Sequence, residues 1–159
     1  MRLKRAQAGA EQDLIVDFFQ SDRDIRRIGE RLLEHTLPRE DWTHAAHCAA
    51  AIYFMRERSE LNLPQRLPAI IRSYNVATGV QNTDVDGYHE TVTQLYLKII
   101  TQFLSVIGEG MTLCEITNFF MRSPFNKLEY LLMFYSRERL FSVEARLRLV
   151  EPDIRPFPE

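Results

Sequence analysis

The chain contains little cysteine, no excess of charge of either sign and no basic patch, and each shortage excludes a class of protein. Its 159 residues include 2 cysteines, Cys48 and Cys114, which are too few and too far apart for a disulfide framework or a thiolate zinc site. Both stand in apolar surroundings, as reduced core cysteines do. Because the formal net charge is -2 and basic residues do not cluster, we expect no binding to nucleic acid.

Long apolar runs and familiar catalytic signatures are also missing. No apolar stretch approaches the roughly 20 residues of a membrane-spanning helix, and the opening "MRLKRAQAGAEQD" lacks the apolar segment of a signal peptide. We therefore expect a cytoplasmic protein without membrane contact. Ser73, Ser123 and Ser136 lie in no G-x-S-x-G or S-x-x-K context, and there is no glycine-rich phosphate loop. Hydrolase triads and nucleotide binding are accordingly set aside.

The residues that are present favour an all-α fold. Hydrophobic residues make up 45% of the chain and charged residues 26%, which is typical of one soluble globular domain. Apolar residues recur at helical spacing, and glycine and proline fall between those segments. We predict an antiparallel helical bundle with extra short C-terminal helices. Its parts are a partly helical N-terminal extension (1–20), one bundle domain (21–150) and a C-terminal tail (151–159).

Capping residues and prolines indicate where the helices begin and end. The first helix follows Ser21, with Asp24 at the capping-box position and His35 on its buried stripe, and Pro38 ends it. The second carries "HAAHCAAAIYFMRER", which is apolar nearly all round and predicts the central helix. We expect the later helices to begin near Asp41 or Thr43, Pro64, Tyr88 and Thr112, with two or three short ones after Asn126.

All four histidines of the chain are predicted to lie at one end of this bundle. Short connections favour antiparallel neighbours, so the end of the first helix, with His35, meets the start of the second, with His44 and His47. The third helix returns to the same end, where a polar loop over residues 78–87 leads to His89 at the head of the fourth helix. A loop of that length often serves a site.

This convergence leads to the hypothesis of a metal site. Side chains at i and i+3 share a helix face, so His44 and His47 can approach one ion, and His89 would be the third ligand. Three imidazoles leave a position open for water or substrate, as in catalytic sites. His35 is a fourth, less favoured candidate, because a helix C-terminus favours protonated imidazole. Glu90 would act beside the ion as general base or as acceptor for a histidine N–H.

Two functions stay open. The first is a metal-dependent enzyme acting on a small molecule, such as a hydrolase, lyase or oxidoreductase, with zinc as the default ion and iron, nickel or copper as alternatives. The second is a non-enzymatic ligand-binding or interaction module, in which the histidines form a hydrogen-bonded structural network. In either case Trp42 and Tyr88 are candidate pocket walls, although aromatic residues there can also be packing staples. Arg72 and Asn75 are candidates to hold an anionic or carbonyl group, or form a solvated helix end.

Two motifs also carry a resemblance. The segment from Trp42 to His47 reads W-T-H-x-A-H, and the segment from Gly87 to Thr91 reads G-Y-H-E-T. In this combination the chain resembles a family of small helical bacterial proteins of uncharacterised function, over roughly residues 30–141. The resemblance implies that these histidines belong to the family's pattern, and it implies no reaction. A looser likeness is to DinB-type helical bundles, which hold a metal with three histidines at one end, but those pair histidines at i and i+4.

Overall fold

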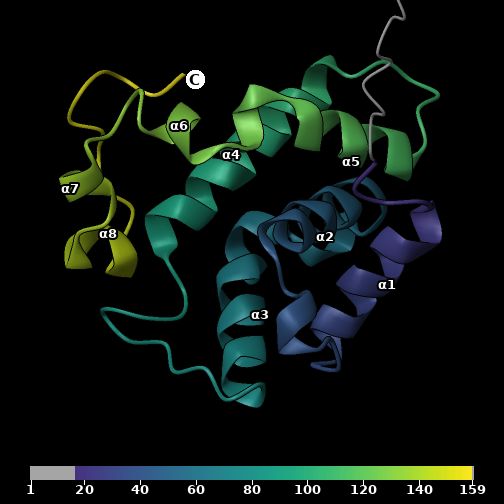
Figure 1. Cartoon of the computed structure of the whole chain (residues 1–159), viewed down its shortest axis with the longest axis horizontal. Helices are drawn as coiled ribbons and strands as arrows, with labels where there is room; N and C mark the ends of the chain where they lie inside the picture. The colour runs from purple at the N-terminus through teal and green to yellow at the C-terminus, as the bar shows by residue number, and fades with distance from the viewer. Residues whose placement is uncertain (1–16, 159) are drawn as a thin grey trace, which may run out of the picture.

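The computed structural model describes residues 17–158, and this part of the chain is helical without a strand, which confirms the all-α prediction (Figure 1). Most of the predicted N-terminal extension lies outside the described residues, and residues 17–20 are not helical. The longer helices pack as a bundle, and short helices follow at the C-terminal end. Their bounds are α1 (Asp22–Leu33), α2 (His44–Glu57), α3 (Leu63–Ala77), α4 (Glu90–Val106), α5 (Leu113–Arg122), α6 (Leu128–Leu131), α7 (Arg137–Leu140) and α8 (Val143–Leu147), with 3-10 turns at η1 (Arg39–Asp41), η2 (Ser59–Leu61) and η3 (Pro124–Asn126).

Hydroxyl side chains start three of the longer helices. The side chains of Ser21, Thr43 and Thr112 accept hydrogen bonds from backbone N–H groups of the first turns of α1, α2 and α5. Each such cap satisfies one of the N–H groups that the start of a helix leaves unpaired. The predicted start at Ser21 is confirmed. The second helix was predicted to begin near Asp41 or Thr43, and Thr43 is its N-cap.

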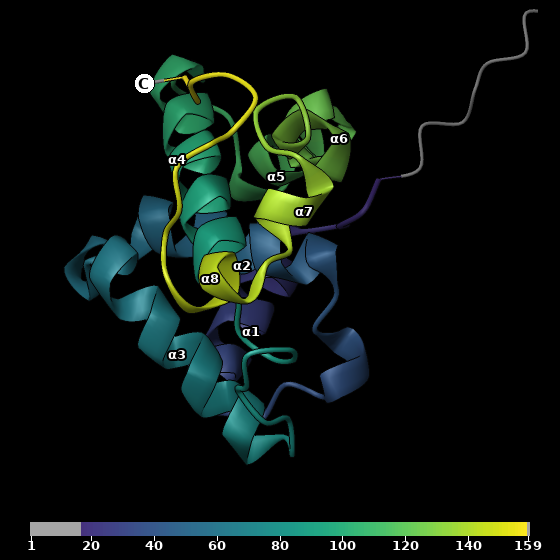
Figure 2. The same cartoon turned by 90° about the vertical axis from the view of Figure 1, so that its left-hand side faces the viewer.

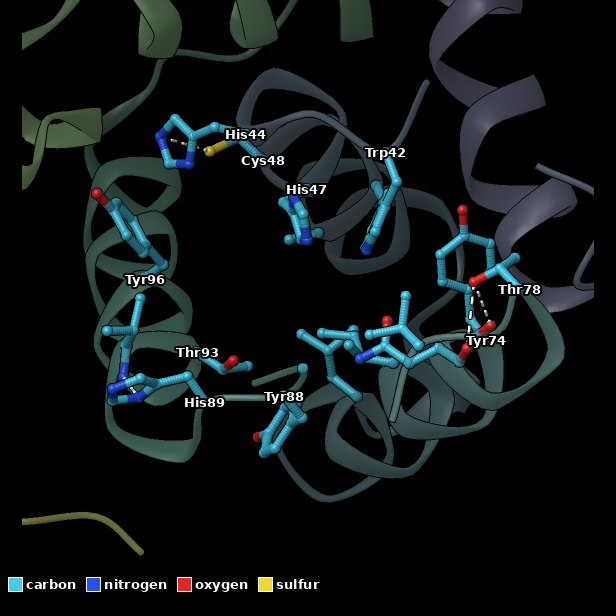
Figure 3. Close-up of a pocket in the computed structure, with 18 of the residues that line it drawn as sticks. Trp42, His44, His47, Cys48, Tyr74, Thr78, Tyr88, His89, Thr93 and Tyr96 are labelled. Atoms are coloured by element: carbon cyan, nitrogen blue, oxygen red, sulfur yellow. Dashed lines mark hydrogen bonds between the residues drawn. The ribbon is translucent and has the colours of Figure 1, made fainter. Parts of the chain in front are cut away.

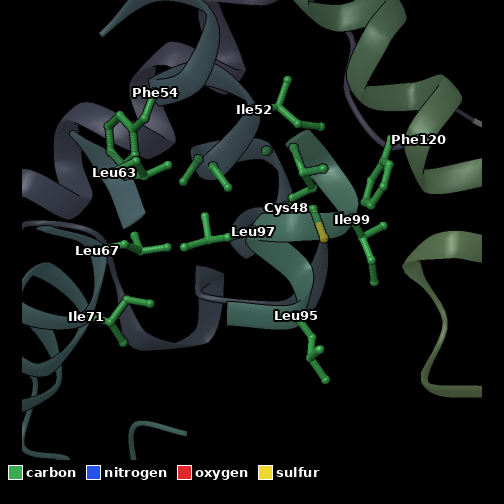
Figure 4. Close-up of a cluster of buried hydrophobic side chains, with 14 of the residues drawn as sticks. Cys48, Ile52, Phe54, Leu63, Leu67, Ile71, Leu95, Leu97, Ile99 and Phe120 are labelled. Atoms are coloured by element: carbon green, nitrogen blue, oxygen red, sulfur yellow. The ribbon is translucent and has the colours of Figure 1, made fainter. Parts of the chain in front are cut away.

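Helix α2 is the centre of the core, as predicted, and packs against α1, α4 and α5 (Figures 1 and 4). Ala49, Ile52 and Phe54 are each 0% exposed, so side chains on several faces of the helix are buried. Gly29 of α1 allows the close approach of the two helices, because a Cβ atom there would lie 2.4 Å from Cδ1 of Tyr53. Burial of an aliphatic or aromatic side chain of this size stabilises the fold by about 1.5–3 kcal/mol.

Helix α8 lies beside the first half of α4, far from it in sequence (Figure 2). The hydroxyl of Thr91 donates to the carbonyl of Arg148 at 2.8 Å and accepts from the N–H of Val150 at 3.2 Å. Arg146 of α8 donates to the carbonyls of Gly87 and Tyr88. The C-terminal segment therefore holds the loop that leads into α4.

The first helix is shorter than its apolar stripe suggested. It ends at Leu33, and His35 follows in the left-handed conformation with φ 58°. The prediction that His35 belongs to the buried face of this helix was therefore wrong, since the reversal of the chain turns the residue outward. No helix among the described residues has both the length and the apolar character needed to cross a membrane.

Candidate ligand-binding cavity

A cavity of about 450 Å³ opens between α2, α3, α4 and the loop over residues 78–89 (Figure 3). Its wall is mostly apolar and aromatic, and its polar groups include the charged side chains of Arg39 and Asp86. Three histidines and three of the four predicted pocket residues are in the wall: His44, His47, His89, Trp42, Asn75 and Tyr88. The remaining surface comes mainly from Leu67, Ile71, Tyr74, Val92, Tyr96 and Leu97.

His47 presents a free ring nitrogen to this cavity. Its Nδ1 lies 2.7 Å from the carbonyl oxygen of Thr43, and because a carbonyl only accepts, Nδ1 carries the proton and Nε2 keeps its lone pair. The ring stacks on Trp42 with 3.8 Å between ring centroids. His47 lines the cavity and is exposed to solvent there. Desolvation by the surrounding protein lowers the pKa of His47 to about 4, against the effect of the Thr43 carbonyl, so the ring is neutral at pH 7.

His44 is turned towards the C-terminal part of the chain. Its Nε2 donates to the carbonyl of Asn126 at 2.7 Å, and the hydroxyl of Tyr96 donates to the same oxygen at 3.0 Å. The thiol of Cys48 is 3.7 Å from that nitrogen. Burial raises the pKa of the Cys48 thiol to about 12, so the sulfur stays protonated and is a poor ligand or nucleophile. His44 thus connects α2 with the turn after α5.

His89 is the N-cap of α4 rather than a residue of its first turn. Its Nδ1 accepts from the backbone N–H of Val92 at 3.3 Å, which leaves the proton on Nε2 in the neutral ring. That Nε2 is buried and has no hydrogen-bond partner. Burial, followed by the positive charge of Arg146, lowers the pKa of His89. The ring is therefore neutral at pH 7, with its lone pair used in capping.

The structure brings three histidines to one cavity but not to one point. In Figure 3 the rings of His44 and His89 lie at opposite ends of the α4 side of the cavity, and His47 lies on α2 beside Trp42. Within residues 17–158 no three histidine, cysteine, aspartate or glutamate side chains are close enough together to hold a metal ion. The three-histidine metal site stays a prediction.

His35, the fourth candidate ligand, is absent from the cavity wall. It is exposed, and its Nε2 lies 3.0 Å from the hydroxyl of Ser73 on α3. The antiparallel packing brought it to the expected end of the bundle, but the left-handed turn after α1 directs it to the outer surface of α3.

Glu90 and Arg72 stand behind the wall instead of in it. Their side chains pair at 3.7 Å, and Glu90 also accepts from Gln94 at 2.9 Å. The Arg72 guanidinium lies over the ring of Tyr88, 4.2 Å from its centroid. The Tyr88 hydroxyl is buried without a hydrogen-bond partner. Burial, and next the charge of Glu90, raise its pKa above the usual range. Arg72 and Glu90 therefore support Tyr88, and the role of Glu90 as a general base stays a prediction.

Asn82 organises the loop and was not singled out from the sequence. Its side-chain oxygen accepts from Nδ2 of Asn75 at 2.8 Å and from the backbone N–H of Tyr88 at 3.1 Å, and its Nδ2 donates to the carbonyl of Arg72 at 3.0 Å. Asparagine in a turn-rich loop is the only local signal for this role. Because of these bonds, Asn75 positions the loop that carries Tyr88.

Comparison with known proteins adds no family to this geometry. No family model, curated protein or solved structure matches the chain. The resemblance carried by the W-T-H-x-A-H and G-Y-H-E-T motifs stays a prediction, and the cavity itself is the basis for a function.

Proposed function

We propose that the protein binds a small, flat and largely apolar molecule in the cavity between α2, α3 and α4. The observation that carries this proposal is the cavity wall, in which apolar and aromatic side chains surround a few convergent polar groups. A volume of about 450 Å³ lies in the range of small-molecule sites, roughly 300–1,000 Å³. Arg39 and Asp86 in the wall carry opposite charges and His47 is neutral, so the wall has no net charge and favours an uncharged ligand.

The rigid parts of the wall support binding rather than simple packing. Trp42 is held between the ring of His47 and that of Tyr74, whose centroid lies 5.5 Å away. Arg72 covers the outer side of Tyr88, and Asn82 fixes the backbone of the same residue. Aromatic walls that are ordered before binding reduce the entropy that a ligand has to overcome.

The test uses naphthalene as a probe and the indole N–H signal of Trp42 as the reporter. The chain has 1 tryptophan, so this NMR signal comes from the cavity alone. We expect a saturable shift of the signal with the full chain. Thr93→Phe, which fills the cavity, should abolish the shift, whereas Thr101→Phe on the exposed face of the same helix should preserve it. An unchanged signal in the parent protein, or equal shifts in both variants, would contradict the proposal.

A metal-dependent enzyme is the second candidate, because three of the four histidines do line one cavity. Its ion would be zinc, or else iron, nickel or copper, as imidazole suits each of them. Purified protein is titrated with each ion by calorimetry. A functional site requires stoichiometric binding that is lost in His47→Ala and kept in His35→Ala, since His35 lies outside the cavity. Absence of binding to every ion would exclude this candidate.

A further inference from the structure

We propose that the cavity recognises a flat molecule whose edge carries a hydrogen-bond acceptor next to a donor, as in the –CO–NH– edge of a lactam or cyclic amide. This inference rests on the proposed small-molecule binding and specifies its ligand class. The two groups that would form hydrogen bonds with this edge are Nε1–H of Trp42 and Nε2 of His47. Figure 3 shows the two rings side by side, with both projecting into the cavity.

Trp42 supplies the donor. An indole N–H can only donate, and in Figure 3 no hydrogen bond joins the Trp42 indole to another of the residues drawn. Buried or half-buried tryptophan usually finds a partner for this group. The indole is half-buried and is held by aromatic neighbours on two sides, so a ligand oxygen is the partner that the cavity can supply.

His47 supplies the acceptor. The Thr43 carbonyl holds the proton on Nδ1, so Nε2 keeps a lone pair that a ligand N–H or O–H can satisfy in place of water. The ring centroids of His47 and Trp42 are 3.8 Å apart, so the donor and the acceptor belong to adjoining rings. One ligand edge can therefore form a hydrogen bond with the Trp42 donor and another with the His47 acceptor.

Other polar edges fit this pair less well. A carboxylate offers acceptors alone, so one of its oxygens would face the lone pair of His47. An ammonium has no lone pair and would direct hydrogens at the indole N–H. An isolated hydroxyl is too small to occupy both positions while its ring lies between the apolar walls. A lactam edge presents its carbonyl to Trp42 and its N–H to His47, and satisfies both.

Three probes of nearly equal shape test this inference by calorimetry on the full chain. They are 2-quinolone, which has the C=O and N–H pair; coumarin, in which a ring oxygen replaces the N–H; and naphthalene, which has neither. We expect 2-quinolone to bind about tenfold more tightly than coumarin, because coumarin loses one hydrogen bond and sets an oxygen against His47. In His47→Phe, which keeps an aromatic ring without the nitrogens, this difference should disappear. In the matched control His35→Ala it should persist.

The outcomes separate this inference from the proposed function. Equal binding of 2-quinolone and coumarin by the parent protein would overturn the lactam inference, while saturable naphthalene binding would still support a small-molecule site. A tenfold difference that survives in His47→Phe would overturn the lactam inference as well. If none of the three probes binds, the inference and the proposed function both fail. A second readout is the direction in which the Trp42 indole N–H signal moves. It should move downfield with 2-quinolone and coumarin, which carry an acceptor, whereas naphthalene should shift it through its ring current alone, without the downfield displacement of a hydrogen bond.

Discussion

His44, His47 and His89 each have one ring nitrogen bonded to a backbone group, and that group decides what the other nitrogen can do. His44 donates to the Asn126 carbonyl and His47 donates to that of Thr43, so in a neutral ring the lone pair is on the second nitrogen. His89 accepts from Val92 and keeps a proton. Of the three, His47 is the one whose ring adjoins Trp42 in the cavity. Protonation of His47 would therefore remove the hydrogen-bond acceptor that we propose for the ligand.

At the residue scale, the first prediction is that His47 titrates near pH 4. Desolvation disfavours the imidazolium, so the pKa is about 4 in the folded protein against 6.5 as the ordinary value. Above pH 6.5 the residue is neutral in both states and has no effect on stability. Between pH 6.5 and 4 the unfolded chain binds the proton first, so the free energy of unfolding decreases as the pH falls. An NMR titration of the His47 ring gives its pKa directly.

The control for this prediction is His47→Phe, in which urea unfolding should lack the His47 contribution to the pH slope between 6.5 and 4. Binding of 2-quinolone should also weaken as the pH falls through 4, because the protonated ring no longer accepts. A measured pKa of 6.5 for His47 would show that its surroundings do not desolvate it.

The sequence predicted that all four histidines lie at one end of the bundle; three of them line one cavity, but the directions of their ring nitrogens were not predicted. Helical spacing and short connections are local properties, so they brought His44, His47 and His89 to one end of the bundle. Ring orientation depends on the nearest carbonyl or N–H. For His44 that partner is Asn126, 82 positions along the chain, which no spacing within a helix can reveal. The prediction of a shared metal ion assumed that histidines on one helix face direct their ring nitrogens at the same point.

At the scale of elements, the helix starts were predictable because caps are local. Ser21 and Thr43 have hydroxyls that satisfy the first N–H groups of their helices, and this chemistry is visible in a few residues. The end of α1 was not predictable in the same way, since the stripe of apolar residues continued to His35 while the backbone reversed. The supporting role of Arg72 was also hidden, because its partners Tyr88 and Glu90 lie across the loop.

A substitution pair at His89 distinguishes capping from metal binding. Asparagine is a good N-cap, so His89→Asn should leave the free energy of unfolding within about 0.5 kcal/mol of the parent, whereas His89→Ala should lower it by about 1 kcal/mol. Chemical denaturation followed by circular dichroism measures both. If His89 is a metal ligand, His89→Asn and His89→Ala should lose metal binding equally, although only His89→Asn keeps the helix cap.

Two glycines of the loop region form a matched test of its geometry. Gly79 and Gly87 both have positive φ, at 82° and 77°, but only Gly87 has close neighbours: an added Cβ would lie 2.5 Å from the carbonyl oxygen of Gln81 and 2.9 Å from Oδ1 of Asn82. Gly79→Ala should cost about 1 kcal/mol of stability from backbone strain alone. Gly87→Ala should cost at least about 2 kcal/mol and weaken naphthalene binding, because it displaces the Asn82 bonds that hold Tyr88. Thermal unfolding and the Trp42 NMR signal report the two effects, and equal costs at both positions would contradict the close packing.

At the scale of the whole molecule, the cavity depends on the C-terminal segment although that segment contributes nothing to its wall. Thr91 holds the backbone of Arg148 and Val150 against α4, and Arg146 on α8 holds the carbonyls of Gly87 and Tyr88. A continuous set of hydrogen bonds therefore runs from the last short helix to the loop beside the cavity. The alternating charges of residues 135–149 are typical of a solvated surface helix, and this pattern does not reveal the contacts with α4.

The last prediction tests this connection with two buried threonines. Thr91 and Thr117 are each 0% exposed. Thr91→Val keeps the shape but leaves the part-buried C=O of Arg148 and the buried N–H of Val150 without this partner, and should cost about 1–3 kcal/mol. Thr117→Val removes only a bond to the carbonyl of Leu113 within α5, which the helical ladder already pairs, and should cost less than about 1 kcal/mol. Urea unfolding measures both. Because α8 holds the loop, Thr91→Val should also weaken naphthalene binding under native conditions, while Thr117→Val should not. Binding that survives Thr91→Val undiminished, despite the loss of stability, would show that the cavity is ordered without the C-terminal segment.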